Sequence, residues 1–100
     1  MNIYNKSTIL EFIAKHADSK GPLSLWYNDV SLKSWKSPKD VKSDFGTASI
    51  IGNNRVVFNI KGNKYRLIAA MNYARGWAQI KFIGTHAQYD KIDAEQVEDY

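Results

Sequence analysis

The sequence contains no cysteine, which excludes disulfide bonds, thiolate metal sites and a cysteine nucleophile. No apolar run approaches the roughly 18 residues that a membrane-spanning helix needs, and residues 1–6 do not lead into the hydrophobic region of a signal peptide. The GxGxxG, Walker, HExxH and GxSxG motifs are also absent, so nucleotide cofactors and serine hydrolysis have no support. We therefore expect a cytoplasmic protein without a cofactor and without a membrane partner.

The positive charge of the chain is concentrated in one stretch. Hydrophobic residues make up 44% of the sequence, enough for a single folded domain over residues 1–100. Residues 53–91 contain seven basic residues and one acid, whereas residues 92–100 contain four acids and no base. The basic stretch favours an anionic partner. The acidic end could extend a helix, fold back onto the cations or remain a solvated tail, and we expect the solvated tail.

Helical patterns fill the first half of the chain. Residues 1–4 alternate enough for a short strand, after which Asn5 or Ser7 can cap a helix predicted over about residues 6–17. Pro22 suits the first turn of a second helix that fades near residues 33–36. Ser37 and the proline that follows it predict a third short helix to about residue 44, which a glycine ends.

From residue 47 the period changes to that of strands, with Gly- and Asn-containing turns between them. Strands are expected over residues 48–51, 55–60, 64–73 and 77–83. The pattern predicts an α+β fold, in which two to three N-terminal helices pack on one face of an antiparallel sheet. A short helix is expected after the last strand.

Strand alternation assigns the side chains to two faces, because successive residues point to opposite sides of a sheet. The core face is predicted to comprise Val56, Phe58, Ile60, Tyr65, Leu67, Ala69, Met71, Ala78, Ile80 and Phe82. The other face is mixed but cationic and is predicted to comprise Arg55, Val57, Asn59, Lys64, Arg66, Ile68, Asn72, Trp77, Gln79 and Lys81. We expect this second face to be open and to be the working surface.

Two cations of that face are candidates for binding a phosphate. A guanidinium in mid-strand, as at Arg66, must face water or bind an anion; pairing with an acid such as Asp90 is the plain alternative. Lys81 has the same predicted facing and could place a second cation near the same phosphate. Two cations aimed at one phosphate would stabilise the charge that develops on phosphorus oxygens.

His86 follows the last predicted strand and is a candidate for proton transfer near neutral pH. Tyr89 and Asp90 lie three and four positions further on, on the same side of a helical turn. The alternative is a helix-terminal residue bonded to the backbone. No third ligand lies near His86 and Asp90 in the sequence, so no metal site is expected. His16 is expected to be a solvated residue of the first helix.

Other basic and aromatic residues could bind RNA or could have only a structural role. The turn at residues 61–64 resembles a phosphate-gripping turn, although lysines flank many ordinary hairpin turns. Tyr73, Trp77 and Tyr89 could stack on unpaired bases or could simply pack.

Two motifs resemble those of a known family. Residues 57–67 read VFNIKGNKYRL and residues 84–92 read GTHAQYDKI. Together they are similar to the HigB toxin family of bacterial type II toxin-antitoxin systems. The resemblance extends more loosely over residues 25–27, 35–38 and 41–45.

This resemblance implies a RelE-like fold and a metal-independent endoribonuclease that cuts messenger RNA engaged by the ribosome. In such a reaction the 2'-hydroxyl attacks the adjacent phosphate and leaves a 2',3'-cyclic phosphate and a 5'-hydroxyl. The implied partner is a HigA-type antitoxin with a helix-turn-helix domain. The toxin would contact operator DNA only indirectly, through this antitoxin. ParE-type relatives with a similar fold inhibit DNA gyrase instead, and a basic RNA-binding domain without activity is a further alternative.

The resemblance also implies roles for individual residues. Arg66 and Lys81 are expected to stabilise the phosphate and the transition state, and His86 to act as general acid or base. Tyr89 is expected to transfer a proton or stack on a base. Lysine at position 81 keeps the charge of the arginine often found there in relatives but loses its bidentate fork. The residues expected to contact RNA or the ribosome are Arg55, Asn59, Lys61, Lys64, Trp77 and Lys91.

Overall fold

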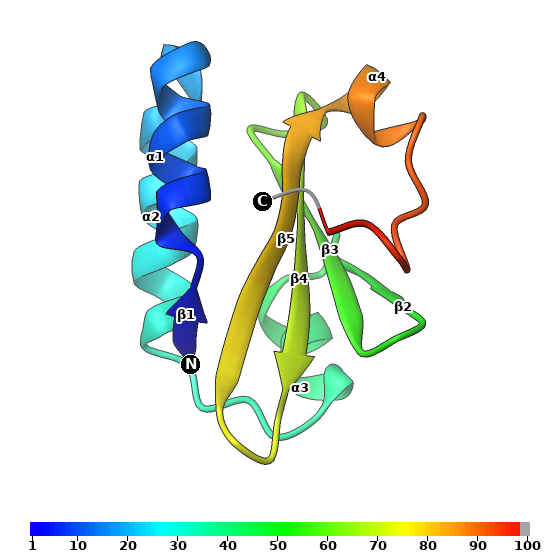
Figure 1. Cartoon of the computed structure of the whole chain (residues 1–100). Helices are drawn as coiled ribbons and strands as arrows, with labels where there is room; N and C mark the ends of the chain where they lie inside the picture. Colours follow the sequence, from blue (N-terminus) through cyan, green and yellow to red (C-terminus); the bar gives the residue numbers. More distant parts are fainter. Residues whose placement is uncertain (99–100) are drawn as a thin grey trace.

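A computed structural model describes residues 1–98 and shows an α+β fold (Figure 1). The elements in chain order are β1 (Asn2–Tyr4), α1 (Lys6–Lys15), the 3-10 turn η1 (Ala17–Ser19), α2 (Lys20–Ser31), α3 (Pro38–Asp44), β2 (Ser49–Ile51), β3 (Arg55–Ile60), β4 (Tyr65–Asn72), β5 (Trp77–Thr85) and α4 (His86–Tyr89). Every predicted helix and strand is present. No helix among the described residues is long and apolar enough to cross a membrane.

The ends of the helices depend on contacts that differ from the expected caps. Asn5 precedes α1, but its side chain donates to the carbonyl of Ile80 at 3.0 Å instead of capping the helix. Pro38 occupies the first turn of α3 as predicted, and the carboxylate of Asp40 accepts from the backbone N–H of Lys36 at 2.8 Å. The second helix begins at Lys20, ahead of its proline, because the first turn of a helix tolerates that residue.

The sheet has five strands in the order β1-β5-β4-β3-β2. Strands β2 to β5 form the predicted antiparallel meander, but β1 pairs parallel with β5. The expectation of a purely antiparallel sheet was therefore wrong. A tight hairpin forces antiparallel pairing only between strands that are consecutive in the chain. In the chain, α1, α2 and α3 separate β1 from β2, so no hairpin sets the direction in which β1 pairs with β5.

The main core lies between the helices and one face of the sheet. Its helical residues include Phe12, Leu23 and Trp26, which pack with strand residues such as Phe58 and Leu67. The rings of Trp26 and Phe58 meet edge to face, with their centroids 5.3 Å apart. The predicted core face is thus confirmed except at one position, Phe82.

A β-bulge moves Phe82 to the opposite face. Ile68 is paired with Phe82 and Ala69 with Ile80, so Lys81 is the extra residue in β5. Beyond the bulge the alternation of β5 reverses. Phe82 therefore packs with Val57 and Ile68 in a second apolar cluster, and its assignment to the main core was wrong.

The segment that follows α4 covers part of this second face. Ile92, Ala94 and Val97 pack against the cluster of Val57, Ile68 and Phe82. The expectation of a solvated acidic tail was therefore wrong for residues 93–98; residues 99 and 100 lie outside the described residues. In Figure 1 this segment, drawn in orange to red, returns across the sheet beside β3.

Candidate functional site

Arg66 and Tyr89 meet at the end of the second face that adjoins α4. Arg66 lies on β4, opposite Asn59 on β3 and Gly84 on β5. Its guanidinium donates to the carbonyls of Asn63, at 3.0 Å, and Tyr65, at 3.3 Å. The guanidinium carbon lies 5.8 Å from the centre of the Tyr89 ring. The contact is close enough for a cation–π interaction and places a permanent positive charge beside α4.

Helix α4 holds His86 through a reciprocal cap. The N–H of Gln88 donates to the Thr85 hydroxyl at 3.1 Å, and the N–H of Thr85 donates to the Gln88 side chain at 2.8 Å. The backbone N–H of His86 also donates to the carbonyl of Lys64 at 3.2 Å. A turn of only four residues is thereby tied both to itself and to the β3–β4 hairpin.

The His86 side chain is paired with the carboxylate predicted from its spacing. Nδ1 of His86 lies 3.0 Å from Oδ2 of Asp90, and both side chains are more than half exposed. A carboxylate that accepts from Nδ1–H orients the imidazole and leaves Nε2 to exchange a proton with a ligand. The expected bond between His86 and the backbone is present at its N–H, and its role in proton transfer stays a prediction.

Gly84 allows α4 to lie close to the sheet. A Cβ atom at this position would collide with the ring of Phe82 and would lie 2.9 Å from Oε1 of Gln88. The glycine of the second motif is thus required for packing next to the site. It does not have a left-handed backbone conformation.

The structure places Lys81 with Arg55 and Glu98, and it does not place it beside Arg66. The ammonium of Lys81 lies 2.7 Å from Oε2 of Glu98, and Nη2 of Arg55 lies 3.0 Å from Oε1 of the same carboxylate. The hydrogen bond from Lys81, together with the charge of Arg55, lowers the pKa of Glu98 below its ordinary value. Between this trio and Arg66 lies the second apolar cluster, which includes Tyr89.

Arg55 lies on the predicted face, but that face is covered at this point. Its side chain is 2% exposed, and Nη1 donates to the carbonyls of Ala94, at 3.1 Å, and Val97, at 2.6 Å. Arg55 therefore anchors the C-terminal segment in this conformation. Sequence reasoning missed the role of Glu98, although the excess of acids after residue 91 was the available indication.

A second cluster of charges joins the β3–β4 hairpin to η1. Asp18 accepts from the ammonium of Lys61 at 3.2 Å and from the hydroxyl of Tyr65 at 2.5 Å, and it also pairs with Lys64. The hydrogen bonds from Lys64 and then Tyr65 hold the pKa of Asp18 well below its usual range, and Asp18 in turn raises the pKa of both groups. No local pattern linked Asp18 to this turn.

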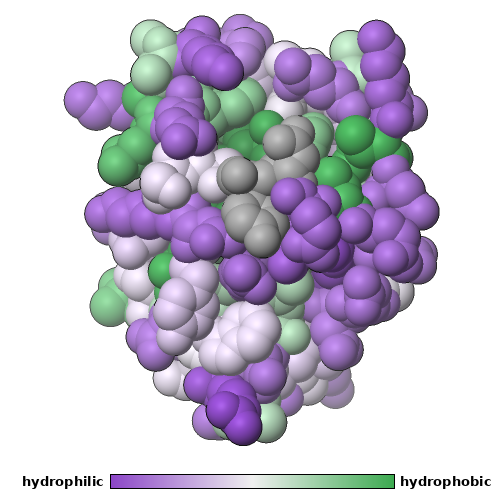
Figure 2. All heavy atoms as spheres, viewed as in Figure 1, coloured by the Kyte–Doolittle hydropathy of each residue, from purple (hydrophilic) through white to green (hydrophobic). Residues whose placement is uncertain are grey.

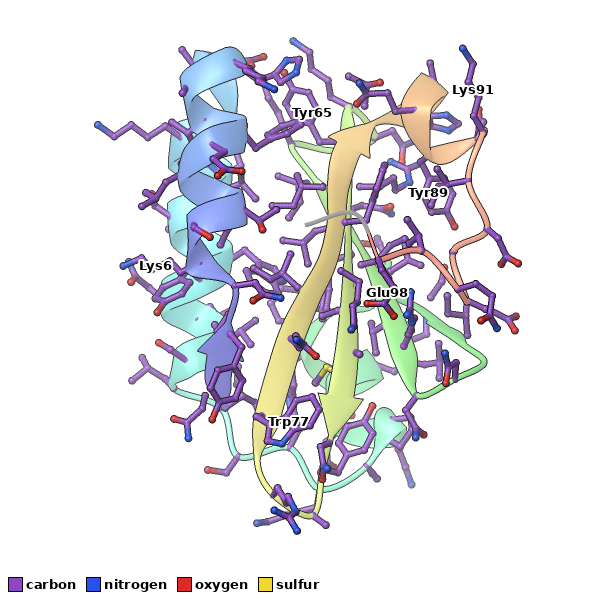
Figure 3. The ribbon with its side chains drawn as sticks, viewed as in Figure 1. Lys6, Tyr65, Trp77, Tyr89, Lys91 and Glu98 are labelled. Atoms are coloured by element: carbon purple, nitrogen blue, oxygen red, sulfur yellow. The ribbon has the colours of Figure 1, made fainter. Side chains whose placement is uncertain are left out.

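The remaining predicted contact residues are dispersed. Asn59 donates to the carbonyl of Thr47 at 3.3 Å. Trp77 lies at the far end of β5 from Tyr89, with its ring edge-on to Tyr4 and their centroids 6.0 Å apart (Figure 3). Lys91 extends from the turn after α4 near the top of the same view. Their roles in RNA or ribosome contact stay predictions.

A cavity of about 440 Å³ lies between α1 and the end of β5. It is lined on one side by residues of α1, including Lys15 and His16, and on the other by residues that include Phe82, Gln88 and Lys91. His16 stacks on Phe12 with the ring centroids 4.4 Å apart, so it is not the fully solvated residue that was expected. In the view of Figure 2, hydrophilic side chains cover much of the surface, and smaller hydrophobic patches lie on the side of α1 and on the side of α4.

Comparison with known proteins places these residues in a family context. Residues 19–92 match the family model of HigB toxins, described as the RelE-like toxic component of a toxin-antitoxin system. The mRNA interferase HigB of Escherichia coli O6:H1 (strain CFT073) is 26% identical over 94 residues, which cover 92% of this chain and 91% of that protein. The matched range contains Arg66, Lys81, His86 and Tyr89, whereas residues 93–98 lie beyond it.

Proposed function

The chain belongs to the HigB family of RelE-like toxins of toxin-antitoxin systems, and from this membership we propose that it is an endoribonuclease that cleaves messenger RNA. The name of the E. coli relative, an mRNA interferase, supports the choice of substrate. The observation that carries the proposal is the His86–Asp90 pair beside the Arg66–Tyr89 contact. It brings an imidazole with a carboxylate partner and a permanent cation to the same end of the sheet.

The proposed reaction needs no metal ion. The 2'-hydroxyl of one nucleotide attacks the adjacent phosphorus, and Nε2 of His86 takes the hydroxyl proton while Asp90 holds Nδ1. The new bond joins the 2'-oxygen to phosphorus, and the bond that breaks joins phosphorus to the 5'-oxygen of the next nucleotide. Arg66 stabilises the charge on the non-bridging oxygens. The Tyr89 hydroxyl is the proposed proton donor to the departing 5'-oxygen, and the products are a 2',3'-cyclic phosphate and a 5'-hydroxyl.

The other predicted residues are assigned to binding. Because Lys81 lies with Glu98 and away from Arg66, we assign it to a neighbouring RNA phosphate and not to the scissile one. Lys61 and Lys64 lie in the turn before β4, where they pair with Asp18, and Lys91 follows α4. We assign all three to contacts with messenger RNA or the ribosome, which would weaken with salt. We further propose that the protein acts on the translating ribosome in the cytoplasm and is neutralised by a HigA-type antitoxin. Operator DNA would be reached only through that antitoxin.

Transcript mapping after induction tests the proposal. Wild-type protein should arrest growth and produce new 5'-hydroxyl ends within messenger RNA. Arg66→Ala and His86→Ala should each lower the cleavage rate about 100-fold or more, the usual contribution of a general acid or base or of one preorganised donor. Lys39→Ala, which removes an exposed cation of α3, is the matched control and should cleave as wild type does.

Two results would refute the proposal. Intact transcripts during growth arrest would exclude RNA cleavage. If purified gyrase then failed to supercoil DNA when this protein was added, the ParE-type activity would be favoured. Unchanged cleavage in both Arg66→Ala and His86→Ala would show that the reaction takes place elsewhere on the protein.

A further inference from the structure

The carboxylate of Glu98 bridges two cations on the face of the sheet that was expected to bind RNA. It accepts from Nη2 of Arg55 at 3.0 Å and from the ammonium of Lys81 at 2.7 Å. The side chain of Glu98 is 56% exposed, whereas those of Lys81 and Arg55 are 13% and 2% exposed. A solvent-facing anion thus shields two cations that contribute to the basic charge of the protein. A phosphodiester has the same charge and also presents two oxygens to its donors.

Arg55 is not fully satisfied by this arrangement. Nη1 donates to the carbonyls of Ala94 and Val97, and Nη2 donates to Glu98. Nε is buried and has no hydrogen-bond partner among the described residues. Nε and Nη2 form the side edge of a guanidinium, which can hold two oxygens of one anion at the same time. The carboxylate uses only one of these two donors, so a phosphate could satisfy the edge better.

Among the described residues, the segment that carries Glu98 is held by side-chain contacts. Residues 93–98 form turns and irregular structure, without a helix or a strand. Besides Arg55, Asn53 donates to the carbonyl of Glu95 at 2.8 Å, and the side chains of Ala94 and Val97 pack on the second apolar cluster. Within residues 93–98 no sheet pairing would have to break for the segment to leave, and segments without such pairing open at a small fraction of the global unfolding free energy.

We propose that Arg55 and Lys81 form a subsite for an RNA phosphodiester, which Glu98 occupies in the free protein and which RNA takes over when residues 93–98 move away. The inference rests on the proposed function, because it names a regulatory feature of the same face. Arg66 lies opposite Asn59, which is four residues from Arg55 on β3. At about 3.3 Å per residue this is roughly 13 Å, so the subsite binds a phosphate that flanks the scissile one.

Binding of a short single-stranded RNA with 2'-O-methyl groups tests the inference, because such an RNA cannot be cleaved by 2'-hydroxyl attack. Fluorescence anisotropy would compare full-length wild type with Glu98→Gln. The matched control is Glu95→Gln, which makes the same charge change at an exposed residue of the same segment. Glu98→Gln should bind about fivefold more tightly, and the control should bind nearly as wild type does. One additional phosphate contact should steepen the plot of log K against log salt by about 0.7.

The double variant Lys81→Gln/Glu98→Gln separates competition from a general loosening of the fold. It should lose most of the gain in affinity, since the gain depends on the positive charge of Lys81. Equal affinities of Glu98→Gln and Glu95→Gln would overturn the inference, as would a gain that persists in the double variant. Absence of any RNA binding by Glu98→Gln would also overturn it.

A parallel cleavage assay in a translation extract distinguishes this inference from the proposed function. If wild type cleaves RNA but Glu98→Gln and Glu95→Gln bind RNA equally well, the Glu98 inference is refuted and the nuclease proposal stands. Tighter binding by Glu98→Gln without cleavage by any variant would support the subsite and refute the nuclease function.

Discussion

Replacing Arg55 by methionine should detach the C-terminal segment and leave the sheet folded. The substitution removes the two hydrogen bonds from Nη1 to the carbonyls of Ala94 and Val97, and the ion pair with Glu98. Methionine is long and flexible enough to fill the space next to Val57 and Ile68 without overpacking it. The variant therefore tests the anchoring contacts more than the packing of the core.

The expected magnitude follows from the contacts. Two hydrogen bonds from a charged donor contribute roughly 1.5 kcal/mol each, or about 3 kcal/mol together. Removing the buried Nε, which has no partner among the described residues, recovers about 1 kcal/mol of desolvation cost. The net loss is about 2 kcal/mol, which raises the population of the open segment roughly 30-fold. The pair with the half-exposed Glu98 adds little, because solvent screens it.

Native-state hydrogen exchange measures this opening directly. The N–H groups of Gln96 and Val97 donate to the carbonyl of Asp93 at 3.1 Å and 2.9 Å, so their protection reports the closed segment. In Arg55→Met these amides should exchange about 30-fold faster, while those of β4 and β5 keep their rates. Arg75→Met, at an exposed turn residue, is the matched control. Unchanged exchange at residues 96 and 97 would show that apolar contacts alone hold the segment.

Two further predictions concern Gly84 and Asp18. Gly84→Ala should lower the free energy of unfolding, measured with denaturant, by roughly 1–3 kcal/mol, because the new methyl group displaces Phe82 and Gln88. It should also slow RNA cleavage, because Gln88 caps the helix that carries His86. Gly46→Ala, with open space around the added carbon, should do neither. The pKa of Asp18 is lowered on folding, so its contribution is complete above the unfolded pKa of about 4 and is lost as the pH falls below it. The stability difference between wild type and Asp18→Asn should therefore shrink as the pH is lowered from about 5 to 2, and a constant difference would contradict the ion cluster.

Local chemistry explains most of what the sequence could predict. Pro38 fixes the start of α3 through the φ of one residue, and the spacing of Leu23, Trp26 and Val30 selects the buried side of α2. The contact between His86 and Asp90 also follows from spacing, since residues four apart meet on a helical turn. In each case the interacting residues are close in the sequence, so their spacing alone is enough to predict the contact.

Long-range register explains what could not be predicted. The extra residue at Lys81 reverses the facing of Phe82, and only the pairing with β4 shows that it is there. The pairing of Asp18 with the hairpin turn joins residues more than 40 positions apart. The docking of Glu98 on Arg55 is equally remote in sequence. No periodicity encodes such contacts, and loop closure entropy places only a weak constraint on them.

The second apolar cluster connects the Arg66 end of the face with Arg55 and Lys81, the two cations that Glu98 covers. Val57, Ile68 and Phe82 support Tyr89, which lies beside Arg66, and they also support Val97, which lies next to Glu98. A strand of RNA that displaces residues 93–98 therefore removes part of the packing of the cluster that supports Tyr89. Because protein interiors are densely packed, the cluster must adjust when Val97 leaves, and we expect Tyr89 to adjust with it. We therefore expect the release of residues 93–98 to change the hydrogen-exchange rates of the backbone amides near Tyr89 and the fluorescence of that region. This should happen even with an RNA that reaches only Arg55 and Lys81.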